Sequence, residues 1–325
     1  MLSTYASGTL DSVIHGMLDK SRRKLIMAAV KSNALVAWAF ASNRVETETG
    51  ANITNPLIVG RNPNITSTQY YAQIPVAQTN ELDTIRFGWS RVVGTYIVSE
   101  QEEDENTGPE AILKIAKVKM QVLEESITER FSTWLYGTGS GLDPNGLGNL
   151  IPDDPTTGSI GGISRSTQAQ WRTSAYQFGG TLDASNILEA FDDIMLDLTL
   201  KGEKPDIILV GRNIYRLWRQ AVRDQVMITL NDTKMGSKMF DLGFKGGSHD
   251  GVPIVYDEDC GVNRAYFINS KYLRLHMLKG VNMRVKKLNS PWNMDAHGSR
   301  VQWQGQFAIW KAYRTHAVLR NGTTG

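Results

Sequence analysis

The chain has 325 residues, of which 41% are apolar, 21% are charged and one is cysteine. The ordinary apolar content and a net charge of only +2 exclude an intrinsically disordered protein. Cys260 has no second cysteine to pair with, which excludes a disulfide-bonded scaffold. This length exceeds the size at which a single core usually keeps growing, so we expect two compact subdomains.

The small net charge is the sum of two halves of opposite sign. Residues 1–200 carry 15 Lys and Arg against 23 Asp and Glu, whereas residues 201–325 carry 20 against 10. This asymmetry suits contact between copies of the chain, or one face turned toward a polyanion. A basic half that is merely solvated explains the charge count equally well.

The N-terminal region contains the longest wholly apolar run, residues 34–41, which is far shorter than the roughly 20 residues of a membrane span. A basic cluster precedes this run as in a signal peptide, but it lies too deep in the chain, and Lys31-Ser-Asn interrupts the apolar region. We therefore expect a cytosolic chain with no membrane contact. Helical spacing of apolar residues predicts a helix over residues 8–41 with a break near Lys31.

Residues 44–98 have a different character, with many Thr, Asn, Ile and Val and with turn signals such as Asn55-Pro56 and Thr79-Asn80. A segment this polar cannot form a core of its own. It predicts a long β-hairpin arm that leans on another subunit, because a lone hairpin is marginally stable. The expected strand runs are 57–59, 69–74, 85–89 and, the most strand-like, 91–98.

An acidic run at residues 100–105 precedes Pro109, which is well placed as the first residue of a helix. We predict one helix from Pro109 to Tyr136, about 42 Å long at 1.5 Å per residue. A helix of that length would act as a structural beam. Its apolar stripe consists of Ile112, Ala116, Met120, Leu123, Ile127, Phe131 and Trp134.

The chain after residue 180 follows an alternating α/β pattern. Asp183 is placed to cap a helix over 184–200, and a second helix is expected over 213–225. Strands are expected at 205–211, 252–256, 265–268 and 281–288, and one long strand at 301–320.

The sequence offers no catalytic, cofactor or metal motif. The glycines at 137, 139 and 141 follow a helix and lack a Walker lysine, so they do not predict a phosphate loop. Ser248-His249-Asp250 has the residue types of a hydrolase triad, but consecutive residues cannot converge as a triad does. The five histidines are scattered, and Cys260 is expected to be a small buried or loop residue. We predict that the chain is not an enzyme and binds no cofactor or metal.

The order of these elements resembles the major capsid proteins of tailed bacteriophages, which share the Hong Kong 97-like α+β fold. The resemblance covers nearly the whole chain. It is carried by the helix at 109–136 and by local motifs before and after residue 200. These motifs are Leu135-Tyr-Gly-Thr-Gly, Gly146-Leu-Gly-Asn-Leu-Ile, Thr157-Gly-Ser-Ile-Gly-Gly-Ile-Ser-Arg, Pro205-Asp-Ile-Ile-Leu-Val, Asp250-Gly-Val-Pro-Ile-Val and Tyr266-Phe-Ile-Asn.

The resemblance implies a division into four parts. Residues 1–43 would form an N-terminal arm and residues 44–98 an extended β-hairpin loop that lies over a neighbouring subunit. Residues 99–180 and 276–325 would form a peripheral domain with the spine helix 109–136. Residues 181–275 would form an axial domain at the centre of pentamers and hexamers.

The function implied is that of a structural protein that assembles into an icosahedral shell around double-stranded DNA. The implied location is the virion capsid, assembled in the host bacterial cytoplasm. The implied partners are further copies of the chain, a portal protein, a separate scaffolding protein, an optional decoration protein and packaged DNA held by non-specific contact.

Candidate contact residues follow from charge and from the resemblance. Acidic residues before the spine helix are expected to meet arginines on a neighbour, and exposed aromatic residues are expected at subunit contacts. The inter-subunit candidates are Glu100, Glu102, Glu103, Glu105, Arg61, Tyr70, Tyr71, Arg212, Arg216, Arg219, Arg223 and Trp292. The candidates for interior contact with DNA are Arg22, Arg23 and Lys24.

Covalent linkage between subunits is one family feature that this chain lacks the residues for. Some members join a lysine of the extended loop to an asparagine by an isopeptide bond, but no lysine lies between Ser32 and Leu113 here. We predict that mature particles, boiled in denaturant, run as a single monomer band on a gel. A ladder of covalent multimers would contradict this.

Two other functions remain open at this point. One is an encapsulin-like compartment shell, which has the same fold but encloses a protein cargo. The other is an α/β enzyme or nucleotide-binding protein built around residues 180–270, against which the missing site chemistry weighs. The material that co-purifies with particles, nucleic acid or protein cargo, would separate the viral shell from the compartment shell. A monomeric elution profile would favour the enzyme.

Overall fold

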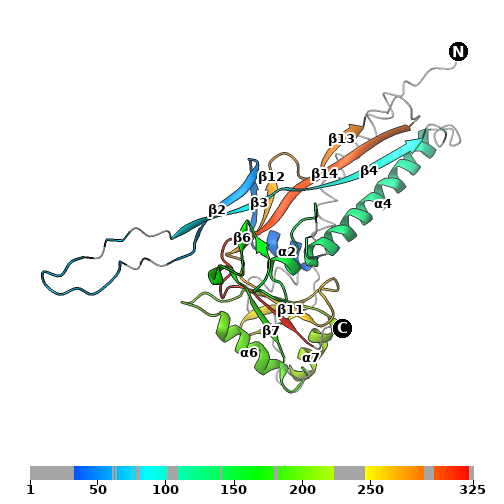
Figure 1. The fold of residues 1–325 in the computed structure, drawn as a ribbon. Helices are drawn as coiled ribbons and strands as arrows, with labels where there is room; N and C mark the ends of the chain where they lie inside the picture. The colour runs from blue at the N-terminus through cyan, green and yellow to red at the C-terminus, as the bar shows by residue number, and fades with distance from the viewer. Residues whose placement is uncertain are drawn as a thin grey trace, which may run out of the picture.

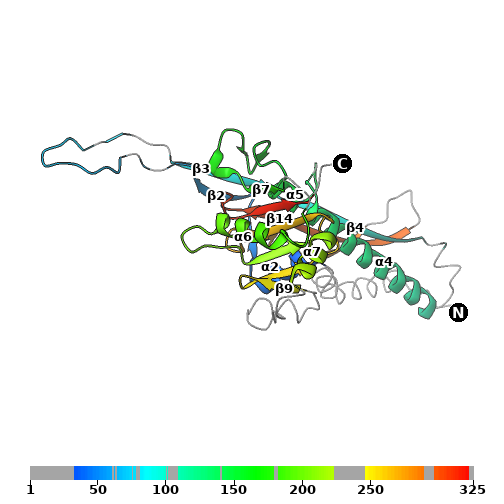
Figure 2. The same cartoon turned by 90° about the horizontal axis from the view of Figure 1, so that it is seen from below.

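The computed structural model describes residues 33–60, 62, 64–74, 76–77, 81–99, 101, 109–139, 141–178, 182–222, 246–288 and 296–321. These residues form three parts that Figure 1 separates clearly. A rounded part holds helices packed against a sheet, an elongated part holds a long helix beside long strands, and a hairpin projects away from both. Figure 2 shows the same hairpin and the far end of the long helix pointing in opposite directions.

The long helix is α4 (Pro109–Tyr136), and both of its ends agree with the prediction. Of its predicted apolar stripe, Ile127 and Phe131 are buried and Leu123 and Trp134 are partly buried. The side chains of Ile112, Ala116 and Met120 lie outside the described residues. Phe131 packs edge-to-face on Trp303 at 4.7 Å between ring centroids. None of the described helices is long and apolar enough to cross a lipid bilayer.

Strand β14 (Ala296–Ile309) is the axis of the elongated sheet. It pairs antiparallel with β4 (Ser90–Ser99) along residues 296–305 and with β12 (Leu273–Leu278) along residues 305–309. The remaining members are β13 (Arg284–Leu288), which pairs with β14, and β1 (Val45–Glu48), which runs parallel to β12. Helix α4 lies along β4, and a β-carbon on Gly94 would come within 2.9 Å of the Leu123 side chain, so this glycine lets the helix approach closely.

The rounded part is built on a six-stranded sheet in the order β7-β15-β11-β8-β10-β9. Its strands are β7 (Ser174–Gln177), β8 (Ile207–Val210), β9 (Gly246–His249), β10 (Val252–Tyr256), β11 (Arg264–Ile268) and β15 (Ala317–Arg320). Every residue of β8 is buried, which matches its uninterrupted apolar sequence. Ile208 and Val210 face the cluster under α6 (Ile187–Leu198) and α7 (Arg212–Val222), whereas Ile207 and Leu209 join the main core on the other face.

The main core also receives the short helix α2 (Ala34–Ala41), which is buried from Ala34 to Ala39. Asn33 caps this helix by accepting hydrogen bonds from the N–H groups of Leu35 and Val36 at 3.0 and 3.2 Å. The buried carboxylate of Asp257 accepts from the Ala34 N–H at 3.0 Å and from the Tyr136 hydroxyl at 2.7 Å. One side chain after β10 therefore ties together α2, the end of α4 and the six-stranded sheet.

The hairpin consists of β2 (Asn52–Ile58) and β3 (Leu82–Gly88), paired antiparallel from Asn52 with Gly88 to Ile58 with Leu82. Three short elements complete the described fold: α5 (Leu147–Leu150), a two-stranded ladder of β5 (Ser159–Ile160) and β6 (Ile163–Ser164), and the 3₁₀ turn Ala169–Trp171.

Two predicted elements are corrected by this arrangement. The hairpin arm is shorter than 44–98, because residues 45–48 and 90–99 belong to the elongated sheet, and residues 69–74 form a turn region instead of a strand. The predicted strand 301–320 is two strands, because the chain turns between Ile309 and Ala317 and passes from one sheet to the other. Arg314, with a φ of 52°, lies in that turn.

The four-part division stays a prediction, but strand membership departs from its boundaries. Strands β7 and β15 lie in the six-stranded sheet although the predicted boundaries put them in the peripheral domain. Strand β12 begins at Leu273, inside the predicted axial segment, yet it pairs with β14. The chain crosses between the two sheets at residues 269–272 and again at 310–316, so neither sheet corresponds to a continuous segment.

Candidate assembly surfaces

The projecting hairpin provides the first candidate assembly surface. At its base, alternate residues of the two strands are buried: Ile53 and Leu57 on β2, and Ile85 and Phe87 on β3. Beyond Ile58 and Leu82 this pattern ends, and the chain continues outward as a loop. The loop is held together across its width by Asn64, whose amide exchanges two hydrogen bonds with the backbone of Ala77 at 2.8 and 3.0 Å.

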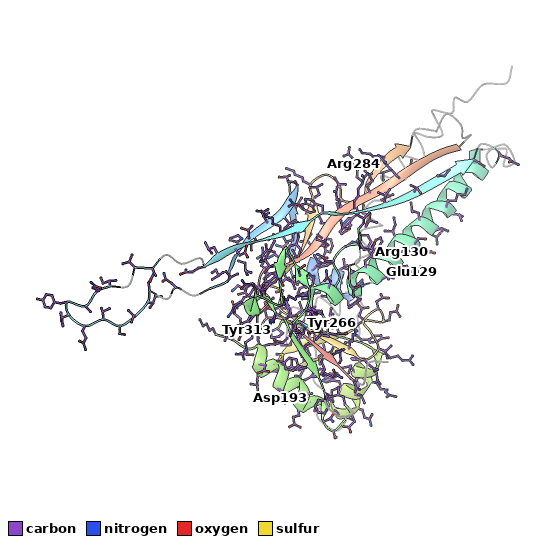
Figure 3. All side chains as sticks on the ribbon, in the orientation of Figure 1. Glu129, Arg130, Asp193, Tyr266, Arg284 and Tyr313 are labelled. Carbon is purple, nitrogen blue, oxygen red and sulfur yellow. The ribbon has the colours of Figure 1, made fainter. Side chains whose placement is uncertain are left out.

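The projecting loop is rich in exposed apolar side chains. Tyr70 and Tyr71 lie at its outer turn and are 97% and 107% exposed. Further large apolar side chains along the projection are also exposed: Ile58, Ile65, Ile74, Val76 and Leu82. Figure 3 shows side chains leaving this loop on both sides into solvent, far from the rest of the chain. Exposed apolar side chains gathered on one segment are typical of an interaction surface.

The long helix and its neighbouring strand form a second exposed surface. Val118 and Val122 on α4 are spaced by four residues and are more than half exposed. On β4, Val93 and Ile97 are also exposed. Figure 3 places the charged Glu129 and Arg130 farther along α4, on its solvent side. The elongated part therefore offers short apolar stripes bordered by charge.

Helix α7 carries the third surface, a row of arginines. Arg212, Arg216 and Arg219 are all exposed on this helix. Arg216 donates to the Asn213 side chain at 3.0 Å, and the Arg219 guanidinium lies 5.9 Å from the centre of the Tyr215 ring. Arg216 and Arg219 were both predicted to contact a neighbouring subunit. These two contacts on α7 support them while they remain exposed.

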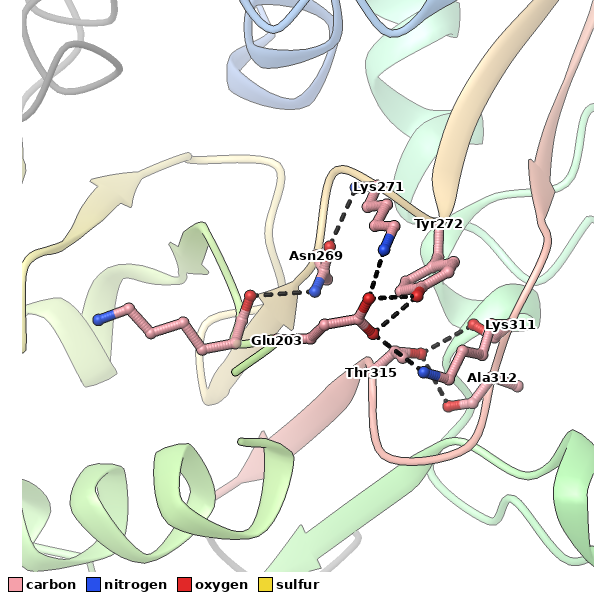
Figure 4. A network of polar contacts seen from close by, with 8 residues as sticks. Glu203, Asn269, Lys271, Tyr272, Lys311, Ala312 and Thr315 are labelled. Atoms are coloured by element: carbon pink, nitrogen blue, oxygen red, sulfur yellow. Dashed lines mark hydrogen bonds and ion pairs between the residues drawn. The ribbon is translucent and has the colours of Figure 1, made fainter. Parts of the chain in front are cut away.

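A polar cluster ties together the two crossings between the sheets (Figure 4). The Glu203 carboxylate, just after α6, accepts from the Tyr272 hydroxyl at 2.7 Å, from Lys311 Nζ at 3.0 Å and from Lys271 Nζ. Lys271 and Tyr272 lie in the first crossing and Lys311 in the second. The Lys311 ammonium also lies 4.7 Å from the centre of the Tyr272 ring. Glu203 thus joins both crossings to the end of α6.

These contacts make the cluster sensitive to acid. Hydrogen bonds from Lys271, Tyr272 and Lys311 lower the pKa of Glu203 from its ordinary 4.5 to about 2. A carboxyl group whose pKa is lowered on folding stabilises the folded chain above its unfolded pKa. That stabilisation is lost as the pH falls from about 4.5 toward 2.

We expect Glu203→Gln to lower the free energy of unfolding at pH 7 by about 1.5 kcal/mol, because hydrogen bonds to a charged acceptor are replaced by weaker neutral ones. The difference between wild type and variant should shrink as the pH is lowered through 4 toward 2. Urea unfolding across this range measures it. The matched control is Glu258→Gln, an exposed glutamate between β10 and β11, which should change little at any pH. A difference that does not depend on pH would contradict the assignment.

Comparison with known proteins rests on structure alone, because no family model and no curated protein matches the sequence. The chain is similar to a chain of the cyanophage A-1(L) capsid, with a TM-score of 0.65 and 16% identity over 87% of this chain and 91% of that one. It is also similar to the capsid of the native GTA particle, with a TM-score of 0.55 and 11% identity over 88% and 91% of the two chains. A third similarity is to Mycobacterium phage Bobi, with a TM-score of 0.50 and 12% identity over 88% and 91%.

The chain has the fold of a phage capsid protein. The α+β Hong Kong 97-like fold expected from the order of its elements is consistent with these neighbours and is confirmed at that level. In this chain the long helix is α4. The projecting hairpin formed by β2 and β3, with the loop between them, is called the arm below.

The structure describes five of the predicted contact residues. Tyr70 and Tyr71 lie together at the end of the arm, and Arg212, Arg216 and Arg219 lie on α7. Within one chain the tyrosines and the arginines lie on separate parts of the molecule. Their roles in contacts between subunits therefore stay predictions. The other candidates lie outside the described residues: Arg22, Arg23, Lys24, Arg61, Glu100, Glu102, Glu103, Glu105, Arg223 and Trp292.

Some surface residues of this capsid fold were missed by the sequence analysis. Ile65, Ile74 and Val76 project from the arm beside the predicted tyrosines. The signal available for Ile65 was a single apolar residue inside a polar segment of Asn, Thr and Ser. Ile74 and Val76 continue the alternation of Tyr70 and Ala72, and this alternation was interpreted as a strand. Val118 and Val122 were missed because they fall outside the helix stripe that was assigned to the core.

Proposed function

We propose that this chain is a major capsid protein that assembles into pentamers and hexamers of an icosahedral shell around double-stranded DNA. The observation that carries the proposal is the arm: it extends a loop whose apolar side chains stay exposed and join neither core cluster of the described residues. An isolated chain gains nothing from such a loop, whereas a neighbouring copy could bury it. The capsid fold supports the same function.

The proposed contacts between copies combine the three surfaces. The apolar arm of one copy would lie over the long helix of a neighbour, where Val118 and Val122 are exposed. The α7 arginines would face the acidic run at residues 100–105 of another copy. Repeated heterologous contacts of this kind close into rings, and rings of two sizes close a shell. A portal protein, a separate scaffolding protein and an optional decoration protein would complete the particle in the host cytoplasm.

An encapsulin-like compartment shell is the second candidate, because the same fold and the same arm serve either cargo. An enzyme is a weaker candidate. Within the described part of the chain, Cys260 is buried and desolvation raises its pKa, so its thiol is a poor nucleophile.

Electron microscopy of the purified full chain tests the proposal, with nucleic acid and protein cargo measured in the same particles. We expect closed icosahedral particles that contain DNA when they are isolated from the producing cell. Particles that contain only a protein cargo would favour the compartment shell. A chain that stays monomeric at high concentration, with and without scaffolding protein, would overturn both shell functions.

A further inference from the structure

Three metal-ligating side chains from distant parts of the sequence meet beside the base of the arm. The Nδ1 atom of His276 lies 2.9 Å from a carboxylate oxygen of Glu48 and 3.6 Å from one of Glu46. All three ligand atoms lie within 4.8 Å of one another. The histidine is separated by 228 residues from Glu48, so sequence spacing gives no indication of the cluster.

The pairing of two strands forces this arrangement. Strands β1 and β12 run parallel, with Glu46 directly opposite His276. Successive side chains of a strand alternate between faces, so Glu48 projects on the same face as Glu46, and Arg274 on the same face as His276. The opposite face of β12 carries Leu275 and Met277, which are buried in the main core. The cluster is therefore set by the backbone and does not depend on flexible loops.

Two carboxylates meet in the cluster beside a buried imidazole. The His276 ring is fully buried, and its Nδ1 atom faces both glutamates. Glu46 forms an ion pair with Arg274. The Glu48 carboxylate lies 2.9 Å from His276 Nδ1. Two carboxylates therefore lie in a partly buried site with one guanidinium beside them.

The orientation of the imidazole directs Nδ1 toward both carboxylates, at 2.9 Å from Glu48 and 3.6 Å from Glu46. The ring is held from the side by Trp310, which it meets edge-to-face at 5.0 Å between centroids. Imidazole nitrogen and carboxylate oxygen are both ligand atoms that zinc takes in proteins, and three such ligands leave a fourth position for water. Calcium and magnesium prefer sites made of oxygen alone.

We propose that Glu46, Glu48 and His276 bind a divalent transition-metal ion, with zinc the best match. The ion would bridge β1 to β12 at the point where the chain leaves the elongated sheet and enters the arm. A ligand that binds only the folded state stabilises that state. The metal would therefore stabilise the folded base of the arm in every copy of the chain.

Zinc titration of the full chain, freed of metal with a chelator, tests the proposal by calorimetry and by the visible spectrum of bound Co²⁺. We expect one saturable site in the wild type and a melting temperature that rises when zinc is added. Glu48→Gln should weaken binding by at least about 100-fold, the upper range for loss of a residue that merely supports a ligand. Glu48 is about one-third exposed and near-isosteric with Gln, so this variant should keep its fold, which circular dichroism checks.

The matched control is His249→Gln, which removes a histidine that pairs with a single carboxylate, Asp192, at 2.9 Å. This variant should bind zinc as the wild type does. His276→Gln should lose binding, but it is a buried substitution and is secondary to Glu48→Gln. A wild-type chain with no saturable site, or a Glu48→Gln variant with unchanged affinity, would overturn the proposal. The assay uses the unassembled chain, so its result is independent of whether the chain forms shells.

Discussion

Replacing residues 60–80 with Asn-Gly is expected to yield a folded chain that no longer assembles. The last backbone hydrogen bond of the hairpin runs from the Val59 N–H to the Glu81 carbonyl at 2.9 Å, so a two-residue turn can close it there. None of the described residues between 60 and 80 belongs to either core cluster, so the melting temperature should change by no more than about 2 °C, equivalent to less than about 1 kcal/mol. The particle yield, measured by gradient sedimentation and electron microscopy, should fall to background.

Two full-length variants test whether assembly depends on the apolar side chains of the loop or only on the loop being present. The combined change Tyr70→Ser, Tyr71→Ser and Ile74→Ser removes exposed apolar surface and should reduce particle yield strongly. The control changes three exposed polar residues of the same loop, Thr66→Ala, Thr68→Ala and Gln69→Ala, and should assemble as the wild type does. Shells formed at wild-type yield by the shortened chain would contradict both the role of the arm and the proposed contact.

Gly211→Ala is expected to cause a large loss of stability from a single methyl group. Gly211 joins β8 to α7, and its N–H donates to the Arg264 carbonyl at 2.9 Å. A β-carbon there would lie 2.0 Å from the Gly261 carbonyl oxygen and 2.8 Å from the carbonyl carbon. These are backbone atoms that cannot rotate away, so the loop at residues 260–264 would have to move from the sheet.

Overpacking of this kind costs about 3 kcal/mol or more when no flexible side chain can yield. The melting temperature of the unassembled chain should therefore fall by about 6–12 °C, at about 2–4 °C per kcal/mol for a chain of this size. Gly88→Ala is the matched control, because a β-carbon at Gly88 meets nothing within 4 Å. Differential scanning calorimetry of both variants measures the effect, and equal melting temperatures would show that the 260–264 loop moves freely.

Local patterns in the sequence were sufficient for the elements that stand alone. Helix α4 begins and ends where Pro109, the apolar spacing and Gly137 predict, because each signal acts within a few residues. Strand β10 also matches its predicted bounds, because a short apolar run between turns allows few alternatives. The charged and apolar residues of α7 sort onto opposite faces as helical spacing requires.

Strand partners could not be predicted in this way. The run 91–98 was correctly expected to be a strand, but its partner is β14, about 200 residues later, and not the adjacent hairpin. The strand predicted at 301–320 looked continuous because apolar and polar residues alternate in the same way in β14 and in β15. The break between β14 and β15 reflects the crossing from one sheet to the other, which depends on where β11 and β12 already lie.

The sequence first indicated two compact subdomains, a nearly balanced net charge and no metal site. The sequence by itself determined the long helix, the polar arm and the segregation of acidic and basic halves, because these are properties of neighbouring residues. Only the tertiary structure decided that the two sheets share interleaved segments, that Glu203 joins both crossings, and that Glu46 and Glu48 meet His276. Each of these depends on strands that pair across more than 60 residues, and side-chain spacing along the chain carries no record of such pairing.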